Sequence, residues 1–120
     1  MPRRYNLYKS LAEKYKGRKI YFENYLDYVK EIKKKSESFL GGVRVLVFGS
    51  IVRENHSVSS DIDILVISQN IPGSIFEQAK IKYELVKDYP DNPFQIHLAT
   101  PSQYEDWYKK FIKEYIEIKI

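Results

Sequence analysis

The 120-residue sequence predicts an α/β (α+β) fold, in which a mixed β-sheet is flanked by helices. Two short runs, residues 43–48 and 61–67, are rich in β-branched residues and have the composition of strands buried on both faces. Longer charged segments around them repeat apolar side chains at helical spacing. The expected order is helix, helix, strand, strand, helix, strand, helix, which favours one domain over residues 1–120.

The N-terminal part, about residues 5–40, is predicted to be helical. Gly17 interrupts the pattern, so we expect a short helix, a break near Gly17 and a long helix. Gly41 and Gly42 suit a helix C-cap followed by a turn. The apolar and aromatic residues at helical spacing are Tyr21, Phe22, Tyr25, Tyr28, Val29, Ile32 and Phe39.

The core of the predicted domain, about residues 43–117, begins with the two strands, which we expect to be neighbours in the sheet. A crossover helix should follow, with Pro72 and Ser74 as its start signals. Its predicted apolar stripe consists of Ile75, Ala79, Tyr83 and Val86.

The last third of the chain is predicted to hold a half-buried strand and a final helix. In "FQIHLA", residues 94–99, apolar and polar side chains alternate as they do in a strand with one face in the core. After a Thr100 cap and Pro101 at the first helical position, an amphipathic helix is expected to continue towards the end of the chain. Its aromatic stripe of Tyr104, Trp107, Tyr108 and Phe111 favours packing, with adenine stacking as the less favoured interpretation.

Composition limits the classes of function. The formal net charge is +4, which favours anionic partners such as nucleotides, nucleic acid or an acidic protein face without choosing among them. The chain has no cysteine, so disulfides and thiolate metal sites are excluded. It has no apolar run of the roughly 20 residues that span a bilayer and no apolar signal-peptide core, so we expect a cytoplasmic protein without a membrane partner.

Two aspartates open the second strand and indicate a metal site. Asp61 and Asp63 stand two residues apart, so the pleat directs both carboxylates to one face while Ile62 points to the other. Mg²⁺ prefers oxygen ligands and commonly takes one or two carboxylates together with substrate phosphates. Two such ions would stabilise both the attacking and the leaving oxygen of an in-line displacement.

A Gly-Ser step directly after the first strand suits phosphate binding. Gly49 would let phosphate oxygens approach the backbone closely, and Ser50 could cap a short helix through Arg53, with free amides as donors. Arg53 would add a positive charge next to a triphosphate.

These residues resemble the signature of the minimal nucleotidyltransferase (MNT) family, within the DNA polymerase beta-like nucleotidyltransferase superfamily. The signature stands here as "FGS", a ten-residue spacer and "DIDILV", with Arg53 and Ser60 at positions where family members commonly carry arginine and serine. The resemblance implies a small nucleotidyltransferase-like fold and a triphosphate held by Gly49 and Ser50, with Arg53 and Ser60 assisting. It also implies Mg²⁺, as two ions, on Asp61 and Asp63, and transfer of a nucleoside monophosphate, AMP from ATP, to an acceptor hydroxyl.

The chain departs from the family at the third carboxylate, which should stand on the strand 94–99. Gln95 and His97 share the polar face of that strand. Gln95 would be a weak metal ligand, whereas His97 could accept a proton near neutral pH or could merely be hydrogen-bonded at the sheet surface.

This departure leaves two classes of function open. The protein is either an active nucleotidyltransferase with His97 or water as proton acceptor, or a catalytically weak nucleotide-binding subunit. Small family members pair with a helical toxin-like protein in toxin-antitoxin systems, so the resemblance implies such a partner. The short chain also suggests that a homodimer or a partner completes the cleft. Nucleic-acid binding is less favoured, because most of the 11 tyrosines lie at packing positions and 16 acidic residues are interleaved with the 20 basic ones.

Overall fold

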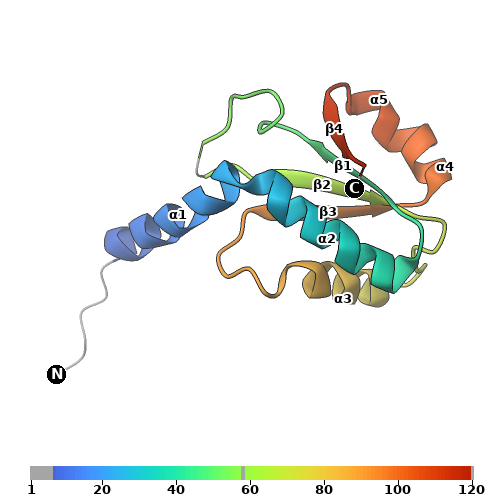
Figure 1. Cartoon of the computed structure of the whole chain (residues 1–120), viewed down its shortest axis with the longest axis horizontal. Helices are drawn as coiled ribbons and strands as arrows, with labels where there is room; N and C mark the ends of the chain where they lie inside the picture. Colours follow the sequence, from blue (N-terminus) through green and yellow to red (C-terminus); the bar gives the residue numbers. More distant parts are fainter. Residues whose placement is uncertain (1–6, 58, 120) are drawn as a thin grey trace.

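The computed structural model describes residues 7–57 and 59–119, with side chains from Leu11 onwards. Four strands form one sheet, and helices cover both of its faces (Figure 1). The elements are α1 (Leu7–Glu23), α2 (Tyr25–Leu40), β1 (Arg44–Phe48), β2 (Ile62–Ile67), α3 (Ile75–Val86), β3 (Phe94–Ala99), α4 (Pro101–Gln103), the π-helical segment η1 (Tyr104–Tyr108), α5 (Lys109–Phe111) and β4 (Tyr115–Ile118). None of the described helices combines the length and the apolar character needed to cross a membrane.

The sheet is mixed, as the sequence predicts, with the strand order β3-β2-β1-β4. β1 pairs antiparallel with both β2 and β4, while β2 and β3 are parallel and are joined by the crossover helix α3. Val45, Leu46 and Val47 in β1 are fully buried, which confirms that this run lies between two packed layers.

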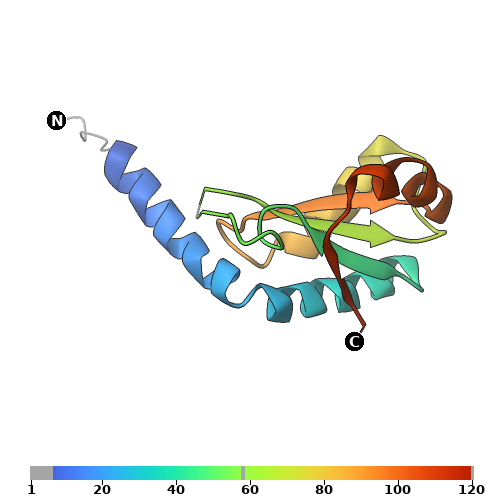
Figure 2. The same ribbon diagram turned by 90° about the horizontal axis from the view of Figure 1, so that it is seen from above.

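Two apolar clusters sandwich the sheet. The larger one lies under α2 and α3 and includes Val29, Ile32 and Leu85. The smaller one lies under the segment α4 to α5 and includes Tyr104 and Ile112. Figure 2 shows α2 on one side of the sheet, and it shows α1 reaching outwards, with only its C-terminal end near the sheet.

The predicted break at Gly17 is wrong, because α1 runs through this residue and ends at Glu23. A glycine within a helix costs only about 1 kcal/mol relative to alanine, and the packing of Tyr21 and Phe22 against the body offsets such a cost. The chain turns at Asn24 instead, and α2 ends as predicted at Gly41, which has a positive φ of 75° and donates its amide to Glu37 O.

The predicted apolar stripe of the crossover helix is wrong for Ile75, Ala79 and Tyr83, which are exposed, and is confirmed for Val86, which packs against the core. Ile75 and Tyr83 are 81% and 64% exposed, whereas Leu85 is buried and Ile81 is partly buried against the core. The helix carries two apolar stripes, and only one can face the sheet. Its start signal is confirmed, since Ser74 accepts a hydrogen bond from the Glu77 amide.

The final helix is shorter than predicted. Thr100 and Gln103 form a capping box with Pro101 at the first position, as expected, but the helical segment ends at Phe111. Residues 115–118 form β4 instead, which pairs with β1. The sequence "YIEI" alternates as a strand does, and pairing satisfies the edge of β1 that would otherwise be open.

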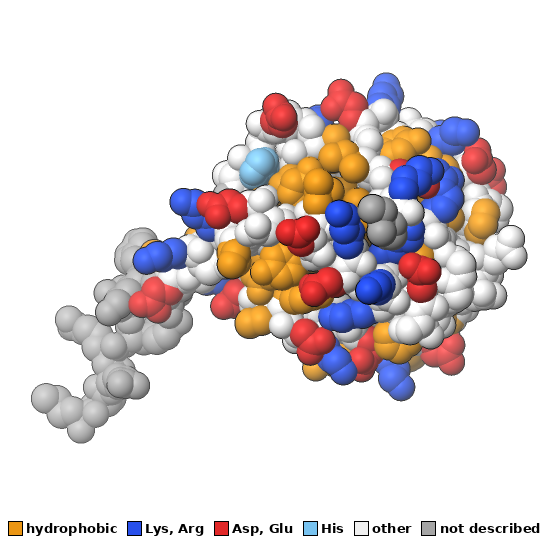
Figure 3. Space-filling model, in the orientation of Figure 1, with side chains coloured by type: hydrophobic (Ala, Val, Ile, Leu, Met, Phe, Trp, Pro, Cys, Tyr) orange, Lys and Arg blue, Asp and Glu red, His pale blue; other side chains and the backbone are white. Residues whose placement is uncertain are grey.

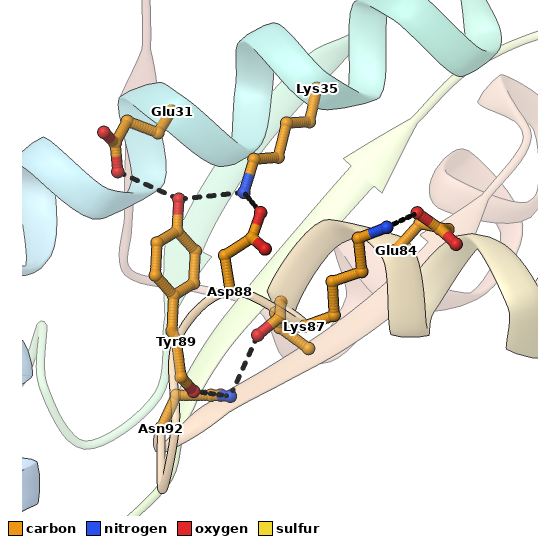
Figure 4. A network of polar contacts seen from close by, with 8 residues as sticks. Glu31, Lys35, Glu84, Lys87, Asp88, Tyr89 and Asn92 are labelled. Atoms are coloured by element: carbon orange, nitrogen blue, oxygen red, sulfur yellow. Dashed lines mark hydrogen bonds and ion pairs between the residues drawn. The ribbon is translucent and has the colours of Figure 1, made fainter.

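A polar network fixes the turn that leads into β3 (Figure 4). The Tyr89 hydroxyl donates to Glu31 at 2.9 Å and accepts from Lys35 at 3.2 Å, which ties the turn to α2. Burial and the neighbouring Glu31 raise the pKa of Tyr89 well above its usual value. Asn92 donates to Tyr89 O at 2.9 Å, so the start of β3 has a defined position beside β2.

Charges of both signs share the surface. On the face where α2 lies in front of the sheet, Lys and Arg side chains lie among Asp and Glu side chains (Figure 3). Among the described residues, the basic side chains on this face are therefore interspersed with acidic ones.

The pairing of β1 with β4 should make stability depend on pH through Glu117. Hydrogen bonds from Arg44, at 2.8 Å, and from Lys119 lower the pKa of Glu117 to about 2. Because this pKa lies below that of the unfolded chain, the contribution is fully present above about pH 4.5 and is lost as the pH falls towards 2.

We therefore expect Glu117→Gln to lower the free energy of unfolding by about 1 kcal/mol at pH 7, after allowance for solvent screening. The difference in free energy of unfolding between Glu117→Gln and the unsubstituted protein should become smaller as the pH falls. Thermal unfolding at several pH values measures it. Glu13→Gln, at an exposed position on α1, serves as the control. A difference in free energy of unfolding that stays constant down to pH 2 would contradict the role of Glu117 in the pH dependence.

Candidate functional site

The end of β1 and the start of β2 meet in a close backbone approach. Phe48 is paired with Asp63 in the antiparallel register, and Gly49 follows with a φ of 87°. A Cβ atom at position 49 would overlap the Asp63 carboxylate. Glycine is therefore favoured here by the backbone conformation, and any larger residue would displace the Asp63 carboxylate.

The chain after Gly49 forms a hydrogen-bonded turn rather than the predicted short helix. The amides of Val52 and Arg53 donate to Gly49 O at 3.2 and 3.3 Å, and the Asn55 amide donates to Ser50 O at 3.2 Å. Among the described residues, the amides of Ser50 and Ile51 have no backbone acceptor. Free donors therefore still lie beside Gly49, as a phosphate site needs.

Asp61 directly precedes β2 and Asp63 is the second residue of that strand, and the intervening Ile62 is fully buried. The Asp61 side chain is 63% exposed and the Asp63 side chain is 28% exposed. Both carboxylates are therefore accessible from solvent, and Asp63 lies beside the polar side chains of β3.

Gln95 and His97 are both close to Asp63, but only His97 contacts the Asp63 carboxylate through its side chain. In the parallel register Gln95 lies directly opposite Asp63 and is exposed. His97, two residues further along β3, brings its Nε2 to 3.3 Å from Asp63 Oδ1. His97 also packs near Phe48 and Tyr108, with ring centroids 5.4 and 6.1 Å away.

One basic side chain at this site has no counterpart in the sequence-based predictions. Arg18, on α1, donates to Ser60 O at 2.7 Å and lies 3.6 Å from Asp61 Oδ1. Ser60 in turn accepts a hydrogen bond from the Ser57 amide through its hydroxyl oxygen, so it closes the loop before β2. Its hydroxyl hydrogen remains available to a ligand.

A cavity of about 230 Å³ lies beside Gly49. Its walls come from the end of β1, from the turn that follows and from the loop between α5 and β4. The lining residues are Phe48, Gly49, Arg53, Phe111, Ile112, Lys113 and Glu114. Lys113 was absent from the sequence-based prediction of the site because the final helix was expected to continue through it, whereas Phe111 was predicted within the aromatic stripe of that helix.

The side chains present fit a divalent cation held by two carboxylates. Asp61 and Asp63 offer hard oxygen donors two residues apart, and Gly49 leaves free the space that the Asp63 carboxylate fills. Within residues 7–57 and 59–119, no three His, Asp or Glu side chains form a ready-made metal cluster. Phosphate or water oxygens would have to complete the coordination.

The comparisons with known proteins identify the family. The model of the nucleotidyltransferase domain matches residues 28–119 of the chain. The chain belongs to the nucleotidyltransferase domain family. No match was found among curated proteins.

Two solved structures are similar to this nucleotidyltransferase. One, a presumed nucleotidyltransferase, is 28% identical with a TM-score of 0.54 and covers 76% of this chain and 97% of its own. The other, a presumed nucleotidyltransferase from Sulfolobus solfataricus, is 20% identical with a TM-score of 0.56, and the match covers 84% and 85% of the two chains. The second likeness concerns the fold alone.

Family membership supports nucleotidyl transfer as the general activity, and nucleotidyltransferase domains generally use divalent metals. The matched region contains the Gly49 turn, both aspartates and His97. Arg18 and the whole of α1 lie outside it.

Because of the contact between Gly49 and Asp63, we expect that substitution of Gly49 destabilises this nucleotidyltransferase. Gly49→Ala should lower the free energy of unfolding by about 2 kcal/mol, because it adds a side chain at a positive φ and displaces the carboxylate. Chemical denaturation measures the change.

Gly42→Ala is the matched control, because a Cβ there meets no atom within 4 Å. It should change stability by less than about 0.5 kcal/mol. Equal effects of the two substitutions would show that the close approach at Gly49 is not maintained in solution.

Proposed function

We propose that this nucleotidyltransferase binds a nucleoside triphosphate together with Mg²⁺ and transfers its nucleoside monophosphate to an acceptor hydroxyl, with ATP as the donor. The observation that carries the proposal is the contact between the Gly49 turn and the Asp63 carboxylate. It brings a backbone suited to phosphate next to a carboxylate suited to a cation, and Asp61 stands two residues before Asp63.

The triphosphate would lie along the turn and the adjoining cavity. The amides after Gly49 and the hydroxyl of Ser50 would donate to phosphate oxygens, and Arg53 and Lys113, which line the cavity, would supply positive charge. At about 230 Å³ the cavity is smaller than the roughly 300–1,000 Å³ of typical ligand pockets, so it suits the phosphate tail better than a whole nucleotide. The hydroxyl of Ser60 could add one donor at the other side.

Asp61 and Asp63 would hold the cation, or two cations, between the carboxylates and the phosphates. Bound there, Mg²⁺ would neutralise charge that develops on the phosphate oxygens. Gln95, opposite Asp63, could offer its amide oxygen, but this neutral group is a weaker ligand for a hard cation than a carboxylate.

In the transfer, the acceptor oxygen forms a bond to the α-phosphorus, and the bond from the α-phosphorus to the oxygen bridging to the β-phosphate breaks. Pyrophosphate leaves with that oxygen and its electron pair. The proton of the acceptor hydroxyl passes to His97 or to water. When Nε2 of His97 carries the hydrogen and donates to Asp63, 3.3 Å away, Nδ1 is left as the proton acceptor.

A second candidate is a catalytically weak nucleotide-binding subunit that acts through a partner, such as a helical toxin-like protein. The exposed apolar side chains of α3 favour it, since Ile75 and Phe76 are 81% and 89% exposed. The neutral Gln95 at the position opposite Asp63 favours it as well. The two candidates share the nucleotide site and differ in turnover.

The proposed function predicts that ATP binds with Mg²⁺ and that binding depends on both aspartates. Asp61→Asn and Asp63→Asn should each weaken Mg²⁺-dependent ATP binding by about tenfold or more, because each removes a charged oxygen ligand. Isothermal titration calorimetry measures the affinity, and Asp106→Asn, at an exposed position in η1, is the control.

Labelled ATP, CTP, GTP and UTP, incubated with Mg²⁺ and a cell extract, would then reveal the donor and the acceptor. An unsubstituted protein that binds none of the four nucleotides with Mg²⁺ would refute the proposed function. Binding without transfer of label would favour the partner-subunit candidate.

Gln95 allows a direct comparison of the two candidates. Gln95→Glu restores a carboxylate opposite Asp63 at nearly constant shape, so it should raise the rate of nucleotidyl transfer about tenfold or more if a weakened metal site limits turnover. Gln95→Met keeps the length without the oxygen and is the control.

Pyrophosphate release under single-turnover conditions measures the rate. An equal rate in Gln95→Glu and in the unsubstituted protein would argue against a missing metal ligand as the limitation.

A further inference from the structure

Arg18 contacts the proposed site from outside the region that the family model matches. We infer that Arg18 is a positioning residue: it holds the peptide between Ser60 and Asp61, and thereby sets how the Asp61 carboxylate meets the cation and the phosphates. This inference rests on the proposed function for its ligand. If the inference holds, the C-terminal end of α1 contributes to nucleotide binding.

The burial of Arg18 is the first argument. The residue is only 7% exposed, although arginine is almost never buried unless it is paired. One terminal nitrogen donates to Ser60 O at 2.7 Å, while Nε is buried without a hydrogen-bond partner among the described residues. An apolar side chain of similar volume would avoid the desolvation of this charge, so packing alone does not account for an arginine here.

The position of Arg18 relative to Asp61 is the second argument. Its short hydrogen bond goes to the Ser60 carbonyl, and its distance to Asp61 Oδ1 is longer, at 3.6 Å. The guanidinium therefore fixes the peptide that precedes Asp61 without closing off the carboxylate, which stays 63% exposed. Its positive charge also offsets part of the repulsion between Asp61 and Asp63.

The loop before β2 depends on the same turn of α1. Within the loop, the Ser60 amide donates to Ser57 O at 3.0 Å, and Ser57 and Ser60 are joined by a second bond through the Ser60 hydroxyl. Phe22, one helical turn after Arg18, stacks on His56 with ring centroids 5.1 Å apart and planes at 2°. Arg18 and Phe22 thus hold the loop at two points, and Arg18 holds the end that leads directly into Asp61.

Each of the two aspartates consequently has one side chain with nitrogen donors beside it. Arg18 lies beside Asp61, and His97 lies beside Asp63. His97 contacts its carboxylate directly, whereas Arg18 acts mainly through the backbone, which is why its loss should alter ligand affinity without removing any ligand atom.

The test compares Arg18→Met, which removes the charge and the donors at similar length, with Arg18→Lys, which keeps the charge. Lys19→Met is the control, since Lys19 is the next residue of α1 and its side chain is 69% exposed. By calorimetry, Arg18→Met should weaken Mg²⁺-dependent ATP binding about tenfold, as expected for a residue that orients a metal ligand. Lys19→Met should change it less than about twofold, and Arg18→Lys should lie between the two.

A second readout needs no ligand. Hydrogen exchange of the backbone amides in residues 59–62 of the nucleotide-free protein should be faster in Arg18→Met than in Lys19→Met, while exchange in β1 stays unchanged. Unchanged far-UV circular dichroism confirms that the variants compared are folded. Should Arg18→Met fail to fold, Arg18→Lys carries the comparison, with a smaller loss of affinity expected.

The last step asks whether Arg18 acts through Asp61. In an Asp61→Asn background, Arg18→Met should cause little further loss of affinity, because coupled residues are not additive. An undiminished loss in that background, or unchanged binding by folded Arg18→Met, would overturn the inference while leaving the proposed function intact. Absence of Mg²⁺-dependent ATP binding in the unsubstituted protein would instead refute the proposed function, and this inference with it.

Discussion

The contact between Gly49 and the Asp63 carboxylate is the constraint on which the candidate site depends. β1 and β2 are antiparallel neighbours, so the bend that ends β1 lies beside the start of β2. A Cβ atom at this position would displace the carboxylate from its place, and the positive φ of 87° also favours glycine. The flanking strands and the two apolar layers hold β1 and β2 in the register that creates this contact.

Around that contact, the supporting groups come from three separate parts of the chain. α1 supplies Arg18, β3 supplies Gln95 and His97, and the loop before β4 supplies Lys113. The division suggests distinct tasks within the proposed reaction. The aspartates would hold the cation, the basic side chains near Gly49 would hold phosphate, and His97 is the side chain of β3 that contacts the Asp63 carboxylate.

The parts of the fold that the sequence predicted well are those with local signals. The strands at 44–48 and 62–67 are short apolar runs, and Ser74, Thr100 and Gly41 are residue types that favour helix ends. That the two aspartates share one face was predicted from the pleat alone, and it stays a prediction because Asp61 lies just before the strand.

The remaining features depend on contacts between distant residues. Position 17 continues as a helix because neighbouring side chains of α1 pack against the body, and α3 turns Leu85 inwards because one of its two apolar stripes fits the sheet better. Arg18 and Ser60 are 42 residues apart in the chain, and no local pattern indicates that they meet. The strand order β3-β2-β1-β4 likewise could not be predicted, because it depends on the pairing of β4 with β1.

The C-terminal strand has a consequence for function that a helix would not have. If residues 112–118 continued the helix, the chain would move on by about 1.5 Å per residue along one axis and would leave the Gly49 turn. The helix ends at Phe111 instead, and the chain crosses beside Gly49 to pair with β1, which places Lys113 in the wall of the cavity. The strand that completes the sheet therefore also completes the cavity, so stability of the β1–β4 pair and affinity for a phosphate-bearing ligand should vary together.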